Sequence, residues 1–463
     1  MIPLTVAKIA EIVGGEIVGI DPTTIVNGDF FFDSRTAIKG GVFAALIGDS
    51  NDGHDYLDHA ISSGAIFALV SREVKAPSIK VANVLDALGK LANYVRMQIK
   101  DLKVIAITGS QGKTTTKDLL AHIFSAVGKT ISPIGSYNND LGAPLTLLKC
   151  NLDTKFCVVE MGARNIGDIA KLTDIAKPNV AVVLKVGSAH LGEFGSRENI
   201  AIAKGEIVTG LTPKDFAVLG NYDEFTPKMA MTTSAKVLSF GESNKSDIRA
   251  ADVEYREGYA HFDLVTPQGR EAVGLRILGM HQVANALAAA AAATALNVPI
   301  EVIASALSTA EVTSKWRMEL KDINGLLIIN DAYNANPESM LAALRTLALL
   351  SQERGGRSWA FLGTMHELGN LSESAHAEIA TAAAALDIDH LVAIGNRQYQ
   401  SAESIEMVSH YYAQQIDAYE LFSHFEVGDV ILVKASRAEH LEIIAAEIAK
   451  FWSAKTIDPE ETL

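Results

Sequence analysis

The sequence predicts an α/β protein of three domains. They are a small N-terminal α/β domain, a central P-loop domain with a doubly wound, mostly parallel sheet and an antiparallel side sheet, and a C-terminal Rossmann-like domain. The chain has 463 residues, more than one compact core holds at about 100–200 residues per domain. From residue 104 onward, short apolar runs alternate with helical segments, which is typical of parallel strands joined by helices. A glycine-rich turn joins the first of these runs to a helix.

Composition excludes several classes of protein. Apolar residues make up 48% of the chain and charged residues 21%, which excludes a disordered, collagen-like or low-complexity chain. The formal net charge is −15, from 40 basic and 55 acidic residues, and this argues against a surface that neutralises many nucleic-acid phosphates. We therefore expect small, locally held anionic partners and no nucleic acid.

The cysteines and apolar segments indicate the compartment. Cys150 and Cys157 have no second pair and no adjacent histidines, so they support neither a disulfide framework nor a zinc site. The first 15 residues lack a basic region ahead of an apolar run, unlike a signal peptide. The Ala-rich stretch 286–296 is far shorter than the ~20 residues of a membrane helix. We expect a cytoplasmic monomer with no membrane insertion.

The N-terminal domain is predicted over residues 1–103. Short apolar runs near residue 30, at 42–48 and at 65–70 mix with turn residues, and a helical pattern at 84–100 follows them. This pattern is typical of a small α/β domain.

The central domain is predicted over residues 104–313. Its buried strands are expected at 104–108, 156–160, 180–187 and 216–221, with helices after the glycine-rich turn and near 166–176 and 197–210. Between 235 and 278 the pattern changes to period two, which predicts an antiparallel side sheet from VLSF, AHFDLV and GLRIL. An Ala-rich helix starting near His281 closes the domain.

The C-terminal domain is predicted over residues 314–463. Four apolar runs, each followed by a helical segment, predict a second Rossmann-like sheet from LLIIND, WAFLG, HLVAIG and VILVKAS.

The segment TGSQGKTTT at 108–116 carries the strongest chemical signal. A glycine-rich turn between a buried strand and a helix presents backbone N–H groups to phosphate oxygens. Lys113 is expected to reach the β- and γ-phosphates and Thr114 to hold Mg²⁺. The spacing G-x-x-G-K-T is shorter than the common P-loop and indicates a subclass. We predict that ATP or GTP binds at Gly109, Ser110, Gln111, Gly112, Lys113, Thr114 and Thr115.

Three further residues are candidates for the site. Glu160 ends an apolar strand, so its carboxylate is expected at the sheet edge where ligands bind, either as a metal ligand or as a solvated charge. His190 lies just beyond the next strand. Lys204 lies in a helix among small and apolar residues. Burial lowers the pKa of a lysine, so a neutral amine that forms a carbamate with CO₂ is one interpretation; composition alone favours a lysine that reaches solvent along apolar surface.

Residues 244–247 read Asn-Lys-Ser-Asp, the guanine-selective pattern of GTPases. The pattern follows a polar turn rather than a buried strand, and no D-x-x-G separates it from the P-loop. This context argues against a GTPase.

Seven segments in this order closely resemble the Mur ligases, the ATP-dependent amide-forming enzymes of peptidoglycan synthesis: TGSQGKTTT, YNNDLGAPLTLL, EMGARNIGDIAKL, SAHLGEFGSRENIAIAKGEI, HQVANALAA, WRME and NDAYNANPES. They span nearly the whole chain. Within the family, five segments resemble the members that join D-alanyl-D-alanine to UDP-N-acetylmuramoyl-tripeptide: DSRTAIKGGVFAALIG, DGHDYL, YNANPESM, GTMHELGNLSESAH and KASRAEHLE. These motifs are specific in combination and weak singly.

The resemblance implies roles for particular residues. Lys113 and Thr114 would bind ATP phosphates and Mg²⁺, and Glu160 would ligate Mg²⁺. His190 and a carbamylated Lys204 would hold a second Mg²⁺, and with Lys113 they would be catalytic. The nucleotide site would also be lined by Asn285, Arg317, Asp331, Asn334 and Asn336, with Arg317 and Asp331 clamping ATP between the central and C-terminal domains.

The resemblance also implies substrate contacts. Ser34 and Arg35 would contact the UDP portion, and Ser436 with Arg437 would lie near the incoming peptide. Near the phosphate and the uridine-linked substrate would lie Asn138 and Asn139. The alternative interpretation of these two asparagines is a turn, and that of Arg437 is a surface charge at a helix start.

Three positions depart from the family pattern. Thr364 stands where an aspartate is usual, and Lys185 and Gln282 each stand where an asparagine is common. Any polar role of residue 364 is therefore in doubt, and Lys185 adds positive charge near the phosphates.

The resemblance implies that the tripeptide carboxylate attacks the γ-phosphate of ATP, and that the amine of D-alanyl-D-alanine then attacks the acyl phosphate. One alternative is another amide ligase of the same fold, either a different Mur step or a folylpolyglutamate synthase. A second alternative is a general P-loop ATPase, and a third is a nucleotide-binding module without catalysis.

Overall fold

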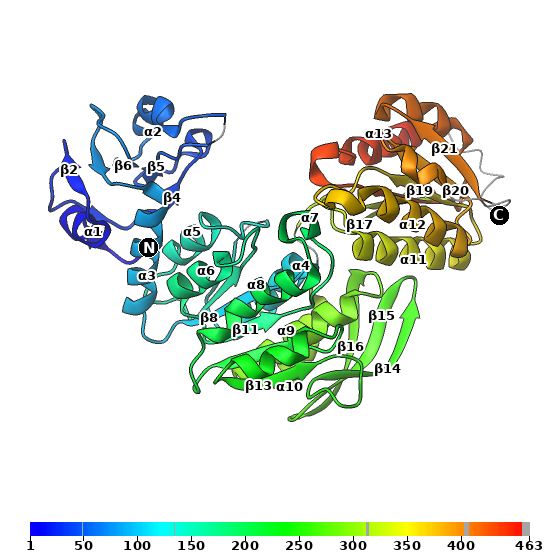
Figure 1. Cartoon of the computed structure of the whole chain (residues 1–463), viewed down its shortest axis with the longest axis horizontal. Coiled ribbons are helices and arrows are strands. Elements are labelled where there is room, and N and C mark those ends of the chain that lie inside the picture. The colour runs from blue at the N-terminus through cyan, green and yellow to red at the C-terminus, as the bar shows by residue number, and fades with distance from the viewer. Residues whose placement is uncertain (49, 134, 312–313, 402–406, 456–463) are drawn as a thin grey trace.

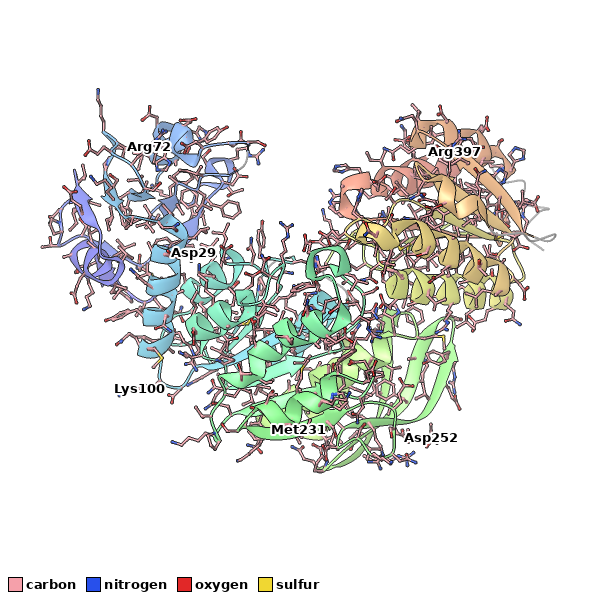
Figure 2. All side chains as sticks on the ribbon, viewed as in Figure 1. Asp29, Arg72, Lys100, Met231, Asp252 and Arg397 are labelled. Carbon is pink, nitrogen blue, oxygen red and sulfur yellow. The ribbon has the colours of Figure 1, made fainter. Side chains whose placement is uncertain are left out.

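The computed structural model describes residues 1–48, 50–133, 135–311, 314–401 and 407–455. It contains three α/β domains, with the N-terminal and C-terminal domains on opposite sides of the central one (Figure 1). With side chains drawn, these two outer domains still stand apart, whereas the central and C-terminal domains meet (Figure 2). Within the described ranges, no helix is both long enough and apolar enough to cross a membrane.

The N-terminal domain has a mixed five-stranded sheet in the order β2-β7-β6-β5-β4, in which only β2 runs antiparallel to its neighbour. A two-stranded ribbon of β1 and β3 lies beside it. The elements are β1 (Leu4–Thr5), α1 (Val6–Val13), β2 (Glu16–Val18), β3 (Ile25–Val26), β4 (Phe30–Phe31), β5 (Val42–Ala44), α2 (Leu57–Ser62), β6 (Phe67–Val70), β7 (Ser78–Lys80) and α3 (Val84–Gln98).

Helix α3 joins the N-terminal domain to the central one. It packs against α1 of its own domain and against α5 (Gly142–Leu148) and α6 (Asp168–Ala176) of the next. Arg96 of α3 donates to the carbonyl of Ala176 at 3.2 Å, at the end of α6. One continuous apolar core therefore extends from the N-terminal domain to the near face of the central sheet.

The central sheet has six parallel strands in the order β13-β12-β11-β8-β10-β9. Helices α5, α6 and α8 cover one face, and α4 and α9 cover the other, while α10 packs against α4, α9 and β16. The strands are β8 (Lys103–Thr108), β9 (Thr130–Ile131), β10 (Phe156–Glu160), β11 (Val180–Val183), β12 (Phe216–Gly220) and β13 (Lys236–Phe240). The remaining helices are α4 (Lys113–Ser125), α7 (Leu191–Phe194), α8 (Arg197–Thr209), α9 (Gln282–Ala295) and α10 (Ile300–Thr309).

The antiparallel side sheet contains β14 (Arg249–Arg256), β15 (Tyr259–Thr266) and β16 (Gly269–Leu278). The assignment of VLSF to this side sheet is wrong, because VLSF lies in β13 and pairs in parallel with β12. Strand β13 is the edge of the central sheet and only its last residue is fully buried. Such a half-exposed edge strand lacks the continuous apolar run of a buried parallel strand, so its pattern does not distinguish it from a strand of an antiparallel sheet.

The C-terminal sheet has the order β17-β18-β22-β19-β20-β21 and is parallel except at β17. The sequence predicted β18, β19, β20 and β22 and missed the two edge strands. Helices α11 and α12 cover one face, and α13 the other. The elements are β17 (Glu319–Ile323), β18 (Leu326–Asn330), α11 (Pro337–Arg354), β19 (Ser358–Leu362), α12 (Ser372–Ala385), β20 (His390–Ile394), β21 (Val408–Tyr412), β22 (Val430–Lys434) and α13 (Glu442–Ala454).

The order of the central sheet determines where ligands can bind. Strand β8 lies between β10 and β11. From β8 the chain runs to β9 and β10 on one side and then crosses to β11 on the other, so the strand order reverses at β8. The carboxyl ends of parallel strands at such a point form a crevice. The P-loop follows β8, Glu160 is the last residue of β10, and His190 lies in the loop after β11.

Candidate active site

A cavity of about 1110 Å³ lies between the central and C-terminal domains. Of the nucleotide, metal and substrate residues that the sequence predicted, all but Gly109, Ser34 and Arg35 line it. They are Ser110, Gln111, Gly112, Lys113, Thr114, Thr115, Asn138, Asn139, Glu160, His190, Lys204, Asn285, Arg317, Asp331, Asn334, Asn336, Ser436 and Arg437.

The P-loop connects β8 to α4 as predicted. Gly112 caps α4 with a φ of 83°, a conformation that favours glycine. A Cβ at this position would also lie 2.2 Å from Oδ1 of Asn285, so no side chain fits. No side chain caps the helix, and its first backbone N–H groups are therefore available to an anion.

Lys113 folds back over the loop. Its Nζ donates a hydrogen bond of 2.8 Å to the carbonyl of Gly109. Burial lowers the pKa of Lys113, and the nearby Glu160 carboxylate acts in the opposite direction. An anionic phosphate at this place would give the half-buried ammonium an oppositely charged partner.

A chain of hydrogen bonds surrounds Glu160. Glu160 is 1% exposed, and it accepts hydrogen bonds from Thr114 Oγ1 at 3.1 Å and from Asn138 Nδ2 at 2.9 Å. Ser136 Oγ lies 2.8 Å from Thr114 Oγ1 and accepts a hydrogen bond of 2.9 Å from Arg317 Nη2. Thr114 and Glu160 present the hydroxyl and carboxylate oxygens that Mg²⁺ binds.

Ser136 was missed by the sequence analysis. It precedes the YNND segment by one residue, and only that adjacency pointed to it. Through Ser136, Arg317 at the start of the C-terminal domain is linked to Thr114 of the P-loop helix. The Arg317 guanidinium also lies 4.1 Å from the centre of the Tyr333 ring, which orients it.

Lys204 lies on α8 and is 3% exposed. Burial, with a smaller contribution from Lys113, lowers its pKa to about 7. Its Nζ makes no hydrogen bond to any residue within the described ranges. A lysine in this environment is partly neutral near pH 7, and the neutral amine is the form that reacts with CO₂.

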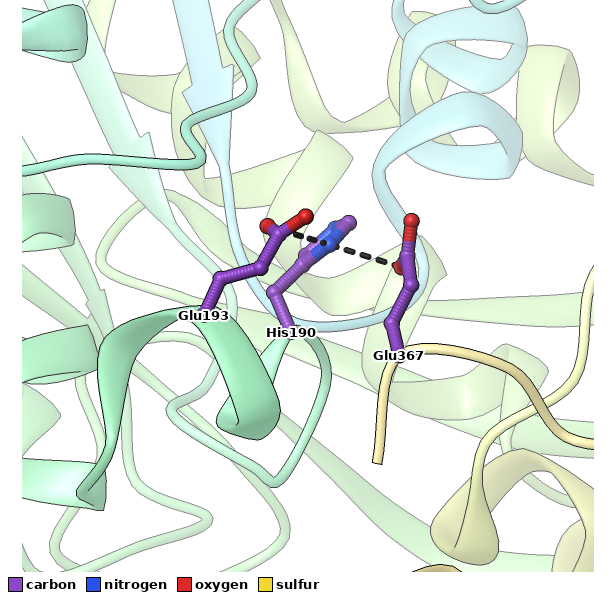
Figure 3. A group of neighbouring side chains, drawn as sticks. All are labelled: His190, Glu193 and Glu367. Atoms are coloured by element: carbon purple, nitrogen blue, oxygen red, sulfur yellow. Dashed lines mark ion pairs between the residues drawn. The ribbon is translucent and has the colours of Figure 1, made fainter. Parts of the chain in front are cut away.

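His190 contacts a residue of the C-terminal domain. Its Nδ1 lies 2.8 Å from Glu367 Oε2 and 3.5 Å from Glu193 Oε2, and Figure 3 shows the ring between the two carboxylates. The contact with His190 lowers the pKa of Glu367. One ligand atom from each of the three residues lies within 4.8 Å of the others. This donor set fits a divalent cation.

His190 and Lys204 border the same cavity, but His190 forms its ion pairs with the two glutamates. Neither glutamate was singled out by the sequence analysis. Glu193 is three residues from His190, one helical turn away, which is a weak signal. Glu367 is 177 positions farther along the chain, and only the fold brings it to His190.

The start of α9 contributes a second polar group. Asn285 Nδ2 donates to Gln282 Oε1 at 2.7 Å, so the glutamine at the position where an asparagine is usual orients Asn285. His281 also lines the cavity, and burial lowers its pKa to about 4. Its ring is therefore neutral at pH 7. Its buried Nδ1 has no hydrogen-bond partner within the described ranges.

Asp331 follows β18 and pairs with a lysine that the sequence analysis did not single out. Lys434, at the end of β22, places Nζ 2.6 Å from Asp331 Oδ2, and it is 2% exposed. The same ammonium donates to the carbonyl of Asn334 at 2.9 Å. Asn336 accepts a hydrogen bond of 2.9 Å from the Ser339 N–H. Its side chain therefore caps α11 at the edge of the cavity.

Ser436 and Arg437 follow β22. Ser436 Oγ accepts a hydrogen bond of 2.9 Å from the His366 N–H, and its own N–H donates to the Thr364 carbonyl at 3.1 Å. The Arg437 guanidinium lies 4.3 Å from the centre of the Trp316 ring and 2.6 Å from Glu442. Thr364 thus contacts Ser436 through its backbone carbonyl.

Lys185 also lies at the P-loop. Its carbonyl accepts a hydrogen bond of 3.0 Å from the Ser110 N–H, and burial lowers its pKa. Its side chain lines the cavity, consistent with the positive charge expected near the phosphates.

Ser34 and Arg35 lie away from this cavity. They begin a 3₁₀ helix of the N-terminal domain, and this domain stands apart from the C-terminal domain (Figure 1). Arg35 is exposed and pairs with Asp33 at 2.7 Å, which lowers the pKa of Asp33 to about 2. Asn139 accepts a hydrogen bond of 3.0 Å from the Gly142 N–H at the start of α5, the turn role that was its alternative interpretation.

Comparison with known proteins identifies the family. Residues 107–293 match the family model of the Mur ligase middle domain, and residues 316–437 match that of the Mur ligase glutamate ligase domain. The chain is 39% identical to the UDP-N-acetylmuramoyl-tripeptide–D-alanyl-D-alanine ligase of Mycobacterium tuberculosis, over 96% of this chain and 97% of that protein.

Two crystal structures are similar over nearly the full length. MurF from Acinetobacter baumannii is 35% identical with a TM-score of 0.88, over 97% of this chain and 99% of that chain. MurF from Thermotoga maritima in complex with ADP is 30% identical with a TM-score of 0.78, over 92% and 98%. The chain therefore belongs to the Mur ligase family.

Proposed function

We infer that this chain joins D-alanyl-D-alanine to UDP-N-acetylmuramoyl-tripeptide in peptidoglycan synthesis, with ATP as the energy source. The observation that carries this inference is the full-length similarity to ligases of this specificity. The cavity adds chemical support, because a P-loop, a buried carboxylate and a second domain meet at one place. The chain is an ATP-dependent ligase of the D-alanyl-D-alanine-adding type.

ATP would bind with its phosphates on the P-loop. The relative from Thermotoga maritima was solved with ADP, which supports a nucleotide at the same place here. The unpartnered N-terminus of α4 and the half-buried ammonium of Lys113 suit the phosphates. Arg317 and Asp331 would close over the nucleotide from the C-terminal domain, with Asn285 and His281 at its other end.

Mg²⁺ would be held at two places. Thr114 and Glu160 offer a hydroxyl and a carboxylate 3.1 Å apart, and His190 with Glu193 and Glu367 offers a second donor set. Mg²⁺ bound there would neutralise phosphate charge during transfer. Of these residues, Thr114, Glu160, His190 and Glu367 line the cavity.

The reaction joins a carboxylate to an amine. The tripeptide carboxylate attacks the γ-phosphorus, the bond to the β-phosphate oxygen breaks, and ADP leaves. The amine of D-alanyl-D-alanine then attacks the acyl carbon and loses a proton, and inorganic phosphate departs. Lys113 lowers the repulsion between the carboxylate and the phosphates. Docking of the C-terminal domain excludes water, which would otherwise hydrolyse the acyl phosphate.

Lys204 would act as a carbamate. Its burial and its pKa of about 7 leave a partly neutral amine beside Lys113. Addition of CO₂ and loss of a proton convert that amine to an anion, which would be stabilised by the neighbouring ammonium and by a cation. An anion at this position would join His190 in holding the second Mg²⁺.

The two substrates would approach from different domains. Ser34 and Arg35 would contact the UDP portion on the N-terminal domain, and Asn138 and Asn139 would lie between that portion and the phosphates. Arg437 would lie near the incoming dipeptide together with Ser436. The open side of the molecule between the outer domains (Figure 1) supports this direction of entry.

The alternatives differ in what ATP turnover requires. Another amide ligase of this fold would use the same P-loop and a different acceptor, and a general P-loop ATPase would need no acceptor.

The test is phosphate release from ATP and Mg²⁺ with UDP-N-acetylmuramoyl-tripeptide, with and without D-alanyl-D-alanine. Single D-amino acids and glutamate serve as control acceptors. Release that requires both the tripeptide and the dipeptide is the expected result. Release with glutamate instead would favour a different ligase, and release without any acceptor would favour a general ATPase.

A further inference from the structure

The loop after β11, residues 184–190, ends in His190. It contacts the P-loop, Asp223 and the C-terminal domain. Its N-terminal half is held by the central domain: the Ser110 N–H donates to the Lys185 carbonyl at 3.0 Å, and the Gly187 N–H donates to Ser110 Oγ at 2.8 Å. The Val186 N–H donates to Asp223 Oδ2 at 2.9 Å. The 184–190 loop is thus hydrogen-bonded directly to the P-loop.

The C-terminal domain holds the next residue of this loop through Glu338. The Ser188 N–H donates to Glu338 Oε1 at 2.8 Å, and Ser188 Oγ donates to Glu338 Oε2 at 2.8 Å. Both carboxylate oxygens are therefore used. A Cβ on Gly187 would lie 2.8 Å from Glu338 Oε1, so the carboxylate packs directly against the loop backbone.

The position of Glu338 is itself well defined. It lies in the first turn of α11, directly after Pro337, and α11 begins with a capping box formed by Asn336 and Ser339. A carboxylate in the first turn of a helix is favoured by the helix dipole, and the capping box limits its motion. The side chain therefore presents two acceptors from a rigid element of one domain to a loop of the other.

We propose that Glu338 is a positioning residue, which orders the 184–190 loop, and with it His190, when the C-terminal domain docks on the central domain. The proposal rests on the proposed function, because it makes assembly of the ligase site depend on docking. Within the described ranges Glu338 is the acceptor for both donors of Ser188. When the C-terminal domain moves away, the segment between Gly187 and His190 loses this contact.

The second contact of the loop is the pair of His190 and Glu367. It lies two residues beyond Ser188 and comes from a different part of the C-terminal domain. Glu338 acts on the backbone of the loop and Glu367 on the imidazole. Loss of Glu338 should therefore loosen the loop without removing any group that binds nucleotide or cation.

The test uses four variants. E338A removes both acceptors, and E338D keeps the charge but shortens the side chain by one methylene. E338Q keeps the geometry, because its amide oxygen can accept from the Ser188 N–H and its amide nitrogen can donate to Ser188 Oγ. E373A is the matched control: Glu373 is also a glutamate in the first turn of a C-terminal-domain helix, but it is exposed.

Two measurements separate positioning from stability. Hydrogen exchange is followed in residues 186–195, α11 and β18 of the full chain, without ligand and with ADP and Mg²⁺. Ligase activity is followed against Mg²⁺ concentration. For E338A and E338D we expect at least about tenfold faster exchange in 186–195 only, and kcat lower by about 10²-fold, the cost of misplacing a group by about 1 Å. E338Q and E373A should match the parent within about threefold.

Two results would overturn the proposal. One is a hydrogen-exchange rate of residues 186–195 in E338D that equals the rate in the parent chain. Because E338D is the more conservative change, this measurement tests the proposal even if E338A does not fold. The other is faster exchange spread evenly over α11 and β18, which would make Glu338 a residue of general stability. A parent chain that fails to join the dipeptide would contradict the proposed function instead, and the exchange data would still decide whether Glu338 orders the loop.

Discussion

Nδ1 of His190 lies 2.8 Å from Oε2 of Glu367, so a candidate metal ligand of the central domain pairs with a carboxylate of the C-terminal domain. The Gly192 N–H also donates to the Glu367 carbonyl at 3.1 Å. The backbones approach so closely that a Cβ on Gly192 would lie 2.8 Å from the Gly369 nitrogen. The proposed cation site and the contact between the two domains therefore share the same residues.

From this contact we predict that E367Q raises the Mg²⁺ concentration needed for half-maximal activity by about tenfold. The amide keeps the shape of the side chain and removes the charge that a cation binds. Activity measured against Mg²⁺ concentration provides the test, with E353Q as the control, since Glu353 is an exposed glutamate of the same domain. An unchanged Mg²⁺ requirement would exclude Glu367 from the cation site.

Replacement of Lys113 tests the P-loop. K113A should lower kcat for phosphate release by at least about 10²–10³-fold, because a positive charge beside the transferred phosphoryl group is lost. K103A is the control, since Lys103 lies exposed at the other end of β8. Near-normal turnover by K113A would contradict the phosphate role.

Replacement of Lys204 tests the carbamate. K204A should lose activity and partly regain it when formate or acetate is added, because a small carboxylate can replace the carbamate anion. In the parent, the carbamate fraction should increase as the pH rises through about 7, the pKa of Lys204, since the neutral amine reacts with CO₂. K214A, at an exposed lysine, is the control. A K204A chain as active as the parent would remove the role.

The buried pair of Asp331 and Lys434 should be important for stability. K434M leaves the Asp331 carboxylate without its buried partner, and breaking such a pair costs about 3–5 kcal/mol in the free energy of unfolding. The double variant D331N/K434M should recover part of that loss. Urea unfolding of the three chains measures it, and a K434M chain as stable as the parent would contradict the account.

Stability should fall in mild acid. His390 stacks on Trp359 with ring centres 3.6 Å apart, and burial, aided by the nearby His410, lowers its pKa to about 4. The folded pKa is below the ordinary value of 6.5, so between pH 6.5 and 4 the unfolded chain binds more protons. The free energy of unfolding is then highest above pH 6.5 and decreases as the pH falls toward 4.

The urea midpoint at pH 7.5, 6 and 5 measures this dependence. H390Q should reduce it, whereas H59Q should not, since His59 is exposed. An equal pH dependence in the parent and H390Q would show that other groups cause it.

Local patterns predicted most of the central domain. Strand β8, the glycine turn and α4 follow each other within 23 residues, so periodicity and turn chemistry reveal them together. The end of β10 likewise predicted the position of Glu160. These residues lie in the cavity because parallel strands end at one edge of the sheet.

Contacts between domains could not be predicted in this way. Glu338 and Glu367 lie in segments that resemble the family, but nothing in those segments identifies their partners Ser188 and His190, which lie 150 and 177 positions away. Ser136 and Arg317 are 181 positions apart, and within the C-terminal domain Lys434 and Asp331 are 103 positions apart. The order of strands and the docking of two domains bring them together. Strand β13 was assigned to the wrong sheet for a related reason, since the pattern of a half-exposed edge strand does not show which strand it pairs with.

The central claim is that the cavity activates a peptide carboxylate with ATP. The most direct test labels both carboxylate oxygens of the tripeptide terminus with ¹⁸O and supplies ATP, Mg²⁺ and D-alanyl-D-alanine. Mass spectrometry of the inorganic phosphate then reports the origin of its oxygens. An acyl phosphate transfers one ¹⁸O atom to each phosphate released, and this is the expected result. Unlabelled phosphate formed in step with the amide product would contradict the account.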